Sequence, residues 1–388
     1  MSRAAASGRP KIFLAAGERS GDLHGAGLAR ALKRLDPEIE LYGVGGAAMA
    51  AAGVELVADC APLSVVGLTE VVPRLPRILG LLRRISAWLR RERPHLYVAI
   101  DAPDFNFRLL PQARRAGITT AYFIVPQFWA WRRGRLRTLG RTVDLALVLF
   151  PFEEEPLESV GVETHFVGHP LAEEVGPAAD RTSRRAELGW DPHRPLAALL
   201  PGSRMSEWQR HLPPLMATVR WFEKKAPELQ WGLSVTPGLD PPGLDRLERR
   251  GVRIFHGPAH ELLQAADAAL VASGTASLEA ALVDTPVIVY YRLTPLTYLM
   301  ARLWVRIQHI AMVNVLAGRR LVPELLQGEV RAERLGGELW NLLHDPEECR
   351  RQRDGFRAVR EQLLLPGAYE RAARHILEKT GALRREPA

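Results

Sequence analysis

The stretch "KIFLAAGERSGDLHGAGLARALK", residues 11–33, joins a short apolar strand pattern, a glycine-rich turn and an amphipathic helical pattern. Residues 11–17 are typical of a β-strand, and the spacing of apolar residues over 25–34 predicts a helix. The glycines of the turn are spaced like those of a nucleotide-binding loop, but Glu18 and Asp22 place acids where phosphates would lie. Strand, tight turn and helix together form the repeating unit of an α/β fold.

The same alternation continues along the 388 residues. The candidate strands of the first half are 11–17, 39–45, 95–101, 119–126, 145–150 and 165–168. Those of the second half are 196–202, 231–235, 252–257, 268–273 and 286–292. Strand–helix alternation predicts parallel sheets with helices on both faces.

The strands fall into two groups, separated by the charged, Pro- and Gly-containing stretch 173–195, our candidate linker. We expect two Rossmann-like, doubly wound domains, 1–175 and 176–355, that face each other across a cleft. A helical tail, 356–388, is expected to pack back on the first domain. The helical pattern near the C-terminus breaks at Pro366-Gly367.

Composition and charge narrow the class of protein. The two cysteines predict no disulfide framework, and no apolar run approaches the roughly 18 residues of a membrane span. We therefore expect a cytoplasmic protein. The net charge of +8 is concentrated in the arginine- and tryptophan-containing stretches 74–93 and 129–141. Such stretches suit an anionic membrane surface or a phosphorylated lipid; a solvated helix face is the alternative. No nucleic-acid-binding signature is present.

Two strand-exit motifs of the second half point to a nucleotide diphosphate. "LLPGSR", 199–204, offers the backbone N–H groups and hydroxyl of its turn and a guanidinium for phosphate; an ordinary turn with a surface arginine is the alternative. "VASGTASLEAAL", 271–282, begins a helix near Thr275, and Glu279 either complements that helix dipole or accepts hydrogen bonds from ribose hydroxyls. The residues that we expect to contact a UDP-sugar in these motifs are Gly202, Ser203, Arg204, Ser273, Gly274, Thr275 and Glu279.

"AIDAPDFNFRL", 99–109, places Asp101 at a strand exit of the first half, where it can act as a general base. Asp104 and Asn106 are equally suited to helix capping. The motif lacks the D-x-D spacing of many metal-dependent sugar transferases, and the histidines form no zinc-like cluster, so we expect no metal. "GVGGAA", 43–48, matches a dinucleotide fingerprint but follows the second strand rather than the first, which makes NAD binding a minor alternative.

Taken together, eight stretches resemble the lipid-A-disaccharide synthase family over about residues 11–330. They are "AGERSGDLHGAGL", "GLTEVVPRLPRI", "AIDAPDFNFRL", "VPQFWAWR", "FVGHPL", "LLPGSR", "ASGTASLEAAL" and "VNVLAGRRLVPELLQ". The resemblance implies an inverting glycosyltransferase with two Rossmann-like domains (GT-B) and no cofactor. It would join UDP-2,3-diacylglucosamine to 2,3-diacylglucosamine 1-phosphate and release UDP. Other enzymes of UDP-sugars and a non-catalytic lipid-binding protein remain alternatives.

The resemblance also implies roles for particular residues. Asp101 would be the general base, and Glu18, with Asp22 as a further candidate, would face the acceptor sugar. Arg204 and Glu279, together with Asn314 and Gln327, would contact the donor nucleotide. Segments 65–93 and 128–133 would hold acyl chains or dock on the inner face of the cytoplasmic membrane, and a homodimer is expected. Val313 and Arg320 depart from the family pattern, which expects a proline and an acid there.

Overall fold

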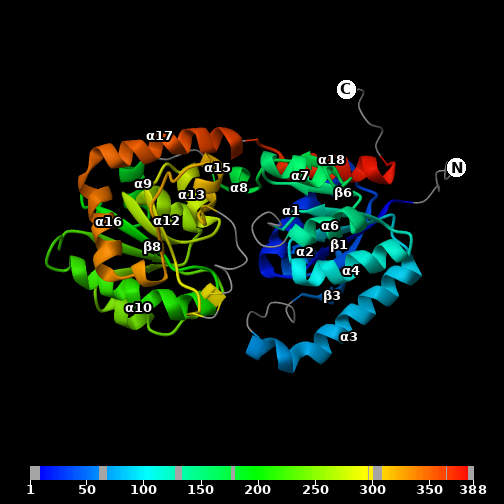
Figure 1. Ribbon diagram of the computed structural model, residues 1–388, viewed down its shortest axis with the longest axis horizontal. Coiled ribbons are helices and arrows are strands. Elements are labelled where there is room, and N and C mark those ends of the chain that lie inside the picture. The colour runs from blue at the N-terminus through cyan, green and yellow to red at the C-terminus, as the bar shows by residue number, and fades with distance from the viewer. Residues whose placement is uncertain are drawn as a thin grey trace. The chain divides into compact units, whose positions relative to one another are not determined.

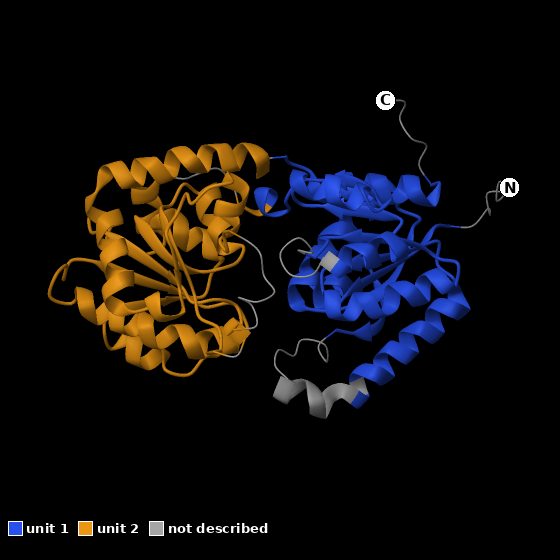
Figure 2. Cartoon of the chain, viewed as in Figure 1, with its two compact units in different colours: residues 1–173, 365–388 blue, residues 174–364 orange. Residues whose placement is uncertain are grey.

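The computed structural model describes residues 9–60, 68–126, 133–175, 180–295, 297–299, 308–363 and 365–382. The side chains of residues 68–75, 77 and 133 lie outside this description. The chain forms two compact units (Figure 2). Unit 1 comprises Met1–Glu173 with Leu365–Ala388, and unit 2 comprises Glu174–Leu364.

Unit 1 is built on a seven-stranded sheet in which all neighbouring strands pair in parallel, in the order β3-β2-β1-β4-β5-β6-β7. Its strands are β1 (Lys11–Ala16), β2 (Glu40–Gly45), β3 (Glu55–Asp59), β4 (Leu96–Ile100), β5 (Thr119–Phe123), β6 (Leu145–Val148) and β7 (Glu163–Phe166). Six of them overlap the predicted strands. The seventh, β3, is a partly exposed edge strand, and its sequence lacks the apolar run that marked the others.

Helices cover both faces of this sheet (Figure 1). They are α1 (Arg19–Leu35), α2 (Ala47–Ala51), α3 (Leu68–Glu92), α4 (Pro103–Arg115), α6 (Arg133–Thr142), α7 (Glu154–Glu158) and α18 (Ala368–Thr380). Phe13 and Tyr97 point into a core shared with α3, α4 and α6, whereas Ile12 and Leu14 are buried on the other side of β1. Helix α18 packs along α1, and the ring of Tyr369 lies directly against Gly27.

Unit 2 contains a six-stranded parallel sheet in the order β10-β9-β8-β11-β12-β13. Its strands are β8 (Leu196–Leu200), β9 (Gln230–Ser234), β10 (Val252–Phe255), β11 (Ala268–Ala272), β12 (Val287–Tyr291) and β13 (Glu324–Leu326). The five predicted strands are all present, and the three-residue edge strand β13 was missed because it is too short to show a pattern. The predicted class, two doubly wound parallel-sheet domains, is confirmed.

The helices of unit 2 surround its sheet. They are α9 (Arg181–Glu187), α10 (Met205–Phe222), α11 (Leu244–Glu248), α12 (Ala259–Ala265), α13 (Ala276–Leu282), α15 (Met312–Ala317), α16 (Ala332–His344) and α17 (Pro346–Leu363). The short helix α8 (Leu171–Glu174) belongs to unit 1 except for its last residue. The predicted break is present, because α17 ends before Pro366 and Gly367 is the N-cap of α18 with φ 87°. Residue 356, where the tail was expected to begin, lies inside α17 and therefore in unit 2.

Candidate active site

At the carboxyl edge of the first sheet, the loops after β1 and β4 touch. These strands are neighbours, and a Cβ built on Gly17 would lie only 2.6 Å from the Cβ of Ala102. Glycine is therefore required at position 17 for this approach. Glu18 is the N-cap residue of α1, and Asp101 precedes Ala102, so the two acids predicted to act together stand in adjacent loops.

The loop after β4 has an unusual backbone. Asp101 and Ala102 both have φ 45°, a left-handed conformation that non-glycine residues rarely adopt. Such a conformation costs about 1–3 kcal/mol per residue and persists only where surrounding contacts hold it. Asp101 is partly exposed, whereas Ala102 is buried. The strain is therefore located at the residue that the sequence singled out as a base.

The two residues expected to cap α4 do not do so. Ala102 is the N-cap residue and no side chain caps this end of the helix. Asp104 is exposed and forms an ion pair with Arg135 at 3.0 Å. Asn106 is fully buried, and its amide donates to the main-chain oxygens of Asp101 at 2.8 Å and Ala15 at 3.2 Å. Asn106 thus links the ends of β1 and β4.

Asp22 has a structural role in place of the expected sugar contact. Its buried carboxylate accepts hydrogen bonds from the backbone N–H groups of Gly46 at 2.7 Å, Ala48 at 3.1 Å and Met49 at 3.0 Å. These groups form the N-terminus of α2; Gly46 and Ala48 belong to the "GVGGAA" motif and Met49 directly follows it. The motif's anion-binding position is therefore filled by the protein's own carboxylate, which removes the structural basis for a dinucleotide at this turn.

In unit 2, the turn after β8 is held by hydrogen bonds to the side chain of Glu207, a residue that the sequence analysis did not predict to have a role. Glu207 Oε2 accepts from the backbone N–H groups of Ser203 at 2.9 Å and Arg204 at 3.2 Å. These N–H groups were expected to bind phosphate, but they already have a partner. The Arg204 guanidinium and the Ser203 hydroxyl are side-chain groups of this turn whose chemistry suits an anion. Gly202, with φ 111°, is required because a Cβ there would lie 2.2 Å from Glu207 Oε2.

The turn after the neighbouring strand β11 is more open. Gly274 has φ 159°, and no atom lies within 4 Å of a Cβ built on it. Ser273 Oγ donates to the main-chain oxygen of Ile310 at 2.9 Å, and Thr275 is the N-cap residue of α13. Gly274 and Thr275 are exposed, so a ligand can approach this backbone closely.

Glu279, one turn into α13, is partly buried beside the N-terminus of α12. Burial, and after it the Glu174 carboxylate, raise the pKa of its carboxyl to about 7, with the His260 N–H acting in the opposite direction. Removal from water disfavours the charged form of a carboxyl group, which explains the direction. Near neutral pH this group is therefore divided between its acid and its carboxylate.

Asn314, which the resemblance implies as a nucleotide contact, links α15 to the segment before β13 in this structure. It is fully buried, its Nδ2 donates to Val322 O at 3.0 Å and Glu324 Oε1 at 2.8 Å, and its Oδ1 accepts from the N–H groups of Leu321 and Val322, both at 2.8 Å. These four hydrogen bonds use both donors and both acceptor positions of the amide, and the nucleotide contact stays a prediction.

Gln327 follows β13 with φ 51°, and its main-chain oxygen accepts from Arg292 Nε at 3.2 Å. Its side-chain amide, oriented to satisfy both groups, donates to Leu293 O at 3.2 Å and accepts from Leu293 N at 3.3 Å. Gln327 therefore joins the exits of β12 and β13.

Comparison with known proteins identifies the family. Residues 12–376 match the family model described as lipid-A-disaccharide synthetase. The chain is 43% identical over 371 residues to a lipid-A-disaccharide synthase of Anaeromyxobacter sp. (strain K), covering 95% of this chain and 97% of that one. It is 41% identical over 372 residues to that of Myxococcus xanthus, with 95% and 97% covered. This chain belongs to the lipid-A-disaccharide synthase family.

Solved structures with the same fold are more distant in sequence. The S. aureus MnaA–UDP complex matches with a TM-score of 0.67 at 13% identity, over 98% of this chain and 99% of that one. The calicheamicin glycosyltransferase CalG4 matches with a TM-score of 0.58 at 18% identity, over 98% and 100%. At this level of identity the likeness establishes the fold, which is the GT-B arrangement expected for a lipid-A-disaccharide synthase family member.

Within this family member, each sheet brings its own predicted residues together. In unit 1, Glu18 and Asp101 share the edge formed by β1 and β4. In unit 2, the strands β8, β11, β12 and β13 are consecutive neighbours, so the predicted residues at 202–204, 273–275 and 327 follow the same edge. Tyr291 and Arg292, at the end of β12, were not predicted. Tyr291 donates to Glu207 Oε1 at 2.9 Å and thereby supports the turn that carries Arg204.

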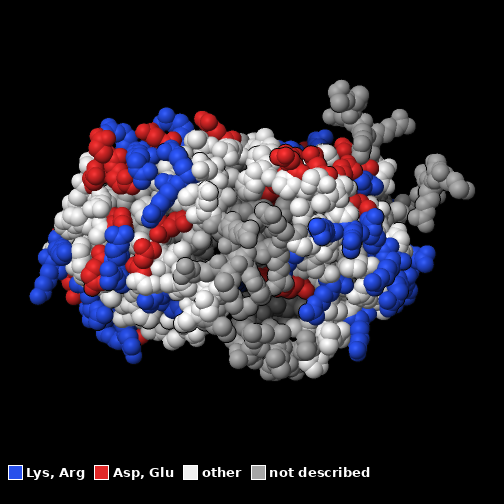
Figure 3. All heavy atoms as spheres, viewed as in Figure 1, with Lys and Arg blue, Asp and Glu red and all other residues white. Residues whose placement is uncertain are grey.

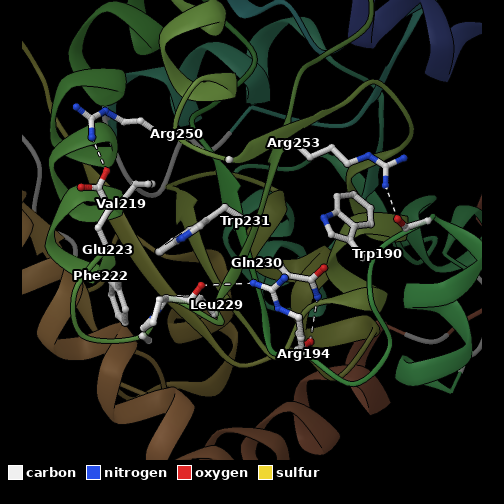
Figure 4. Close-up of a pocket in the computed structure, with 14 residues that line it drawn as sticks. Trp190, Arg194, Val219, Phe222, Glu223, Leu229, Gln230, Trp231, Arg250 and Arg253 are labelled. Atoms are coloured by element: carbon white, nitrogen blue, oxygen red, sulfur yellow. Dashed lines mark hydrogen bonds and ion pairs between the residues drawn. The ribbon is translucent and has the colours of Figure 1, made fainter.

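A pocket of about 490 Å³ lies at the opposite edge of the second sheet (Figure 4). Trp190 and Trp231 form part of its wall, at the residues that lead into β8 and at the start of β9. The arginines that line it already have partners, because Arg250 pairs with Glu223, Arg253 donates to Gly189 O at 2.8 Å and Arg194 donates to Glu228 O at 2.9 Å. This pocket contains none of the predicted site residues.

Several expectations fall partly or wholly outside the described residues. Residues 65–67 and 128–132 belong there, as do the side chains of 68–75, 77 and 133. In the part of the chain that the structure describes, no helix combines the length and apolar character needed to cross a membrane. The same residues contain no cluster of three or more His, Cys, Asp or Glu side chains positioned to hold a metal ion.

Proposed function

We propose that this chain is an inverting glycosyltransferase that transfers 2,3-diacylglucosamine from UDP to 2,3-diacylglucosamine 1-phosphate. The products would be lipid A disaccharide 1-phosphate and UDP. The observation that carries the proposal is the match to lipid-A-disaccharide synthases over nearly the whole chain. The two sheet edges supply chemistry that suits this reaction, an acid in unit 1 and an anion-binding edge in unit 2.

The donor's UDP is assigned to unit 2. Arg204 offers a charge-assisted hydrogen bond to the diphosphate, and the hydroxyl groups of Ser203 and Thr275 lie at the same edge. The open backbone at Gly274 permits a phosphate to approach closely. The Glu279 carboxylate is suited to accept hydrogen bonds from ribose hydroxyls. These groups would stabilise the negative charge that develops on departing UDP without a metal ion.

The acceptor hydroxyl is assigned to Asp101. Its carboxylate takes the proton of the primary hydroxyl as that oxygen forms a bond to the anomeric carbon of the donor. The bond between the anomeric carbon and the diphosphate oxygen breaks in the same step, and its electron pair leaves with UDP. A single in-line displacement inverts the configuration and gives a β-linked product. Glu18, in the adjacent loop, is placed to bind the acceptor sugar.

Because both substrates carry acyl chains, we place the reaction at a membrane surface. Unit 1 carries positive charge that suits an anionic membrane. Exposed arginines on α4 and α6 gather on one part of its surface (Figure 3). They are Arg108, Arg114, Arg115, Arg137 and Arg141. Each basic residue near an anionic bilayer contributes about 1 kcal/mol of attraction. We assign this face to peripheral contact with the cytoplasmic leaflet.

The direct test is incubation of the purified full chain with the two acylated sugars, with mass-spectrometric detection of the disaccharide and of UDP. We expect equimolar disaccharide and UDP. Two further reactions separate the rivals: the UDP-sugar alone, where epimerisation would indicate an epimerase, and a donor with a non-acylated acceptor, where turnover would indicate a soluble acceptor. Absence of UDP release in all three reactions would contradict enzyme function.

A further inference from the structure

The left-handed loop that carries Asp101 is held by a buried hydrogen-bond network. Two groups donate to the main-chain oxygen of Asp101, Asn106 Nδ2 at 2.8 Å and the Tyr122 hydroxyl at 2.8 Å. The Tyr97 hydroxyl donates to Asn106 Oδ1 at 2.7 Å, which orients the amide. Asn106, Tyr97 and Tyr122 are all fully buried.

The network reaches four elements of the first unit. Tyr97 and Tyr122 belong to the neighbouring strands β4 and β5, and Asn106 lies in the first turns of α4. Asn106 also donates to Ala15 O in β1 at 3.2 Å. The carbonyl of Asp101 is thereby tied to strand β5 and helix α4, and Asp101 itself is partly exposed.

We infer that Asn106 and Tyr122 are positioning residues that hold Asp101 in its left-handed conformation and thereby set the direction of its carboxylate toward the acceptor hydroxyl. This inference rests on the proposed function, because it requires Asp101 to be the base. Without the two hydrogen bonds, residues 101 and 102 relax toward ordinary backbone conformations, and the carboxylate leaves hydrogen-bonding reach of the acceptor.

The chain offers a matched control. Thr120 lies two residues before Tyr122 on β5, is fully buried, and donates its hydroxyl to Thr142 O at 2.8 Å. Thr120→Val and Tyr122→Phe each remove one buried hydroxyl and keep the side-chain volume similar. Only the second removes a hydrogen bond to Asp101.

The experiment measures kcat, donor KM and UDP affinity for these two variants and for Asn106→Ala. We expect kcat to fall about 3–10-fold in Tyr122→Phe and more than about tenfold in Asn106→Ala, with donor KM and UDP affinity unchanged within twofold. Thr120→Val should lose comparable thermal stability yet keep kcat within twofold of the wild type.

A second substitution that restores kcat to the Asn106→Ala variant would test the inference more sharply than the single variants do. Glycine adopts positive φ readily, so Ala102→Gly should remove part of the strain that the network holds. We expect the double variant Ala102→Gly with Asn106→Ala to have a higher kcat than Asn106→Ala alone. A double variant no more active than the single one, or equal kcat losses in Thr120→Val and Tyr122→Phe, overturns the inference alone. A wild-type chain that forms no disaccharide overturns the proposed function and the inference with it.

Discussion

The carboxyl edges of the two sheets differ in the type of residue that adopts a positive φ angle. In unit 1, positive φ angles fall on non-glycine residues at the ends of β4 and β5, namely Asp101, Ala102 and Ile124. In unit 2, the residues with positive φ angles in the turns after β8 and β11 are glycines, Gly202 and Gly274. In unit 1 the strained residue Asp101 is tied to buried side chains, whereas the turn after β11 in unit 2 uses a glycine whose backbone is open; Gln327, after β13, is a non-glycine residue of the second edge with φ 51°.

This difference fits the chemistry assigned to each edge. A general base must be held within hydrogen-bonding distance of one proton, so rigidity and local strain are useful there. A diphosphate is bound by several groups over a wider area, and close approach to glycine backbone is useful instead. The predictions below test whether the two edges separate turnover from UDP binding.

The largest effect is expected for Asp101→Ala. Loss of a general base lowers kcat by about 10²–10⁴-fold. Because Asp101 belongs to unit 1 whereas the UDP contacts are assigned to unit 2, we expect a UDP affinity within twofold of the wild type. Steady-state kinetics and calorimetric titration with UDP measure the two quantities. Turnover near the wild-type rate would remove Asp101 from the mechanism.

Glu279→Gln tests the electrostatics of the second edge. Because the folded-state pKa is raised from 4.5 to about 7, the wild type binds a proton more tightly when folded and loses stability as pH rises between these values. The variant lacks this loss and should be more stable above pH 7 by up to about 3 kcal/mol. Denaturant titrations of both proteins at pH 4.5 and pH 8 check it. Equal pH dependence would show that this carboxyl is not buried as described.

The same substitution should also weaken UDP binding at pH 8, because an amide is a weaker acceptor for ribose hydroxyls than a carboxylate. A variant that is more stable and binds UDP less well would show that this acid is kept for function. Unchanged UDP affinity would leave Glu279 with a structural role only.

Arg204→Ala is expected to reduce UDP affinity by about 10–100-fold, the range for a hydrogen bond between charged groups. Its control is Arg220→Ala, an exposed arginine in the last turn of the same helix, α10. Calorimetry at several salt concentrations should also show a weaker salt dependence in Arg204→Ala. If both variants bind UDP like the wild type, the edge at 202–204 is not the diphosphate site.

Gly202→Ala should have the smallest effect of the series, a loss of at least about 1 kcal/mol of stability, because alanine is strained at its φ of 111° and its Cβ would displace Glu207. Gly337→Ala in α16 is the matched control, since no atom lies within 4 Å of a Cβ built there and alanine favours a helix. Denaturant unfolding should move in opposite directions for the two variants. A loss of stability in both would contradict the geometry of the turn.

The repeated fold could be predicted because strands and helices leave local patterns, and eleven of the strands are apolar enough to be recognised individually. The edge strands β3 and β13 were not predicted, because β3 is partly exposed and β13 has only three residues. Candidate site residues at strand exits were predicted by the same logic. The role of Glu207 could also have been inferred, since an acid three residues after Arg204 is the spacing of a capping box.

Other roles depend on partners that are distant in the sequence. Asp22 looked like a ligand-facing acid, but its three N–H partners lie 24–27 residues further on. Asn106 looked like a cap, but one of its partners is Ala15, 91 residues away. Asn314 bonds to a segment whose path follows from the packing of β13. No local pattern distinguishes a buried, fully bonded polar residue from one that faces a ligand.

Hydrogen–deuterium exchange of the full chain, with and without saturating UDP, tests the assignment of the two edges most directly. We predict slower amide exchange in unit 2, over the turns at 201–204 and 273–275, with no change at 17–22 or 101–106 in unit 1. Protection centred on the β1 or β4 exits, with none at the β8 and β11 exits, would contradict the account.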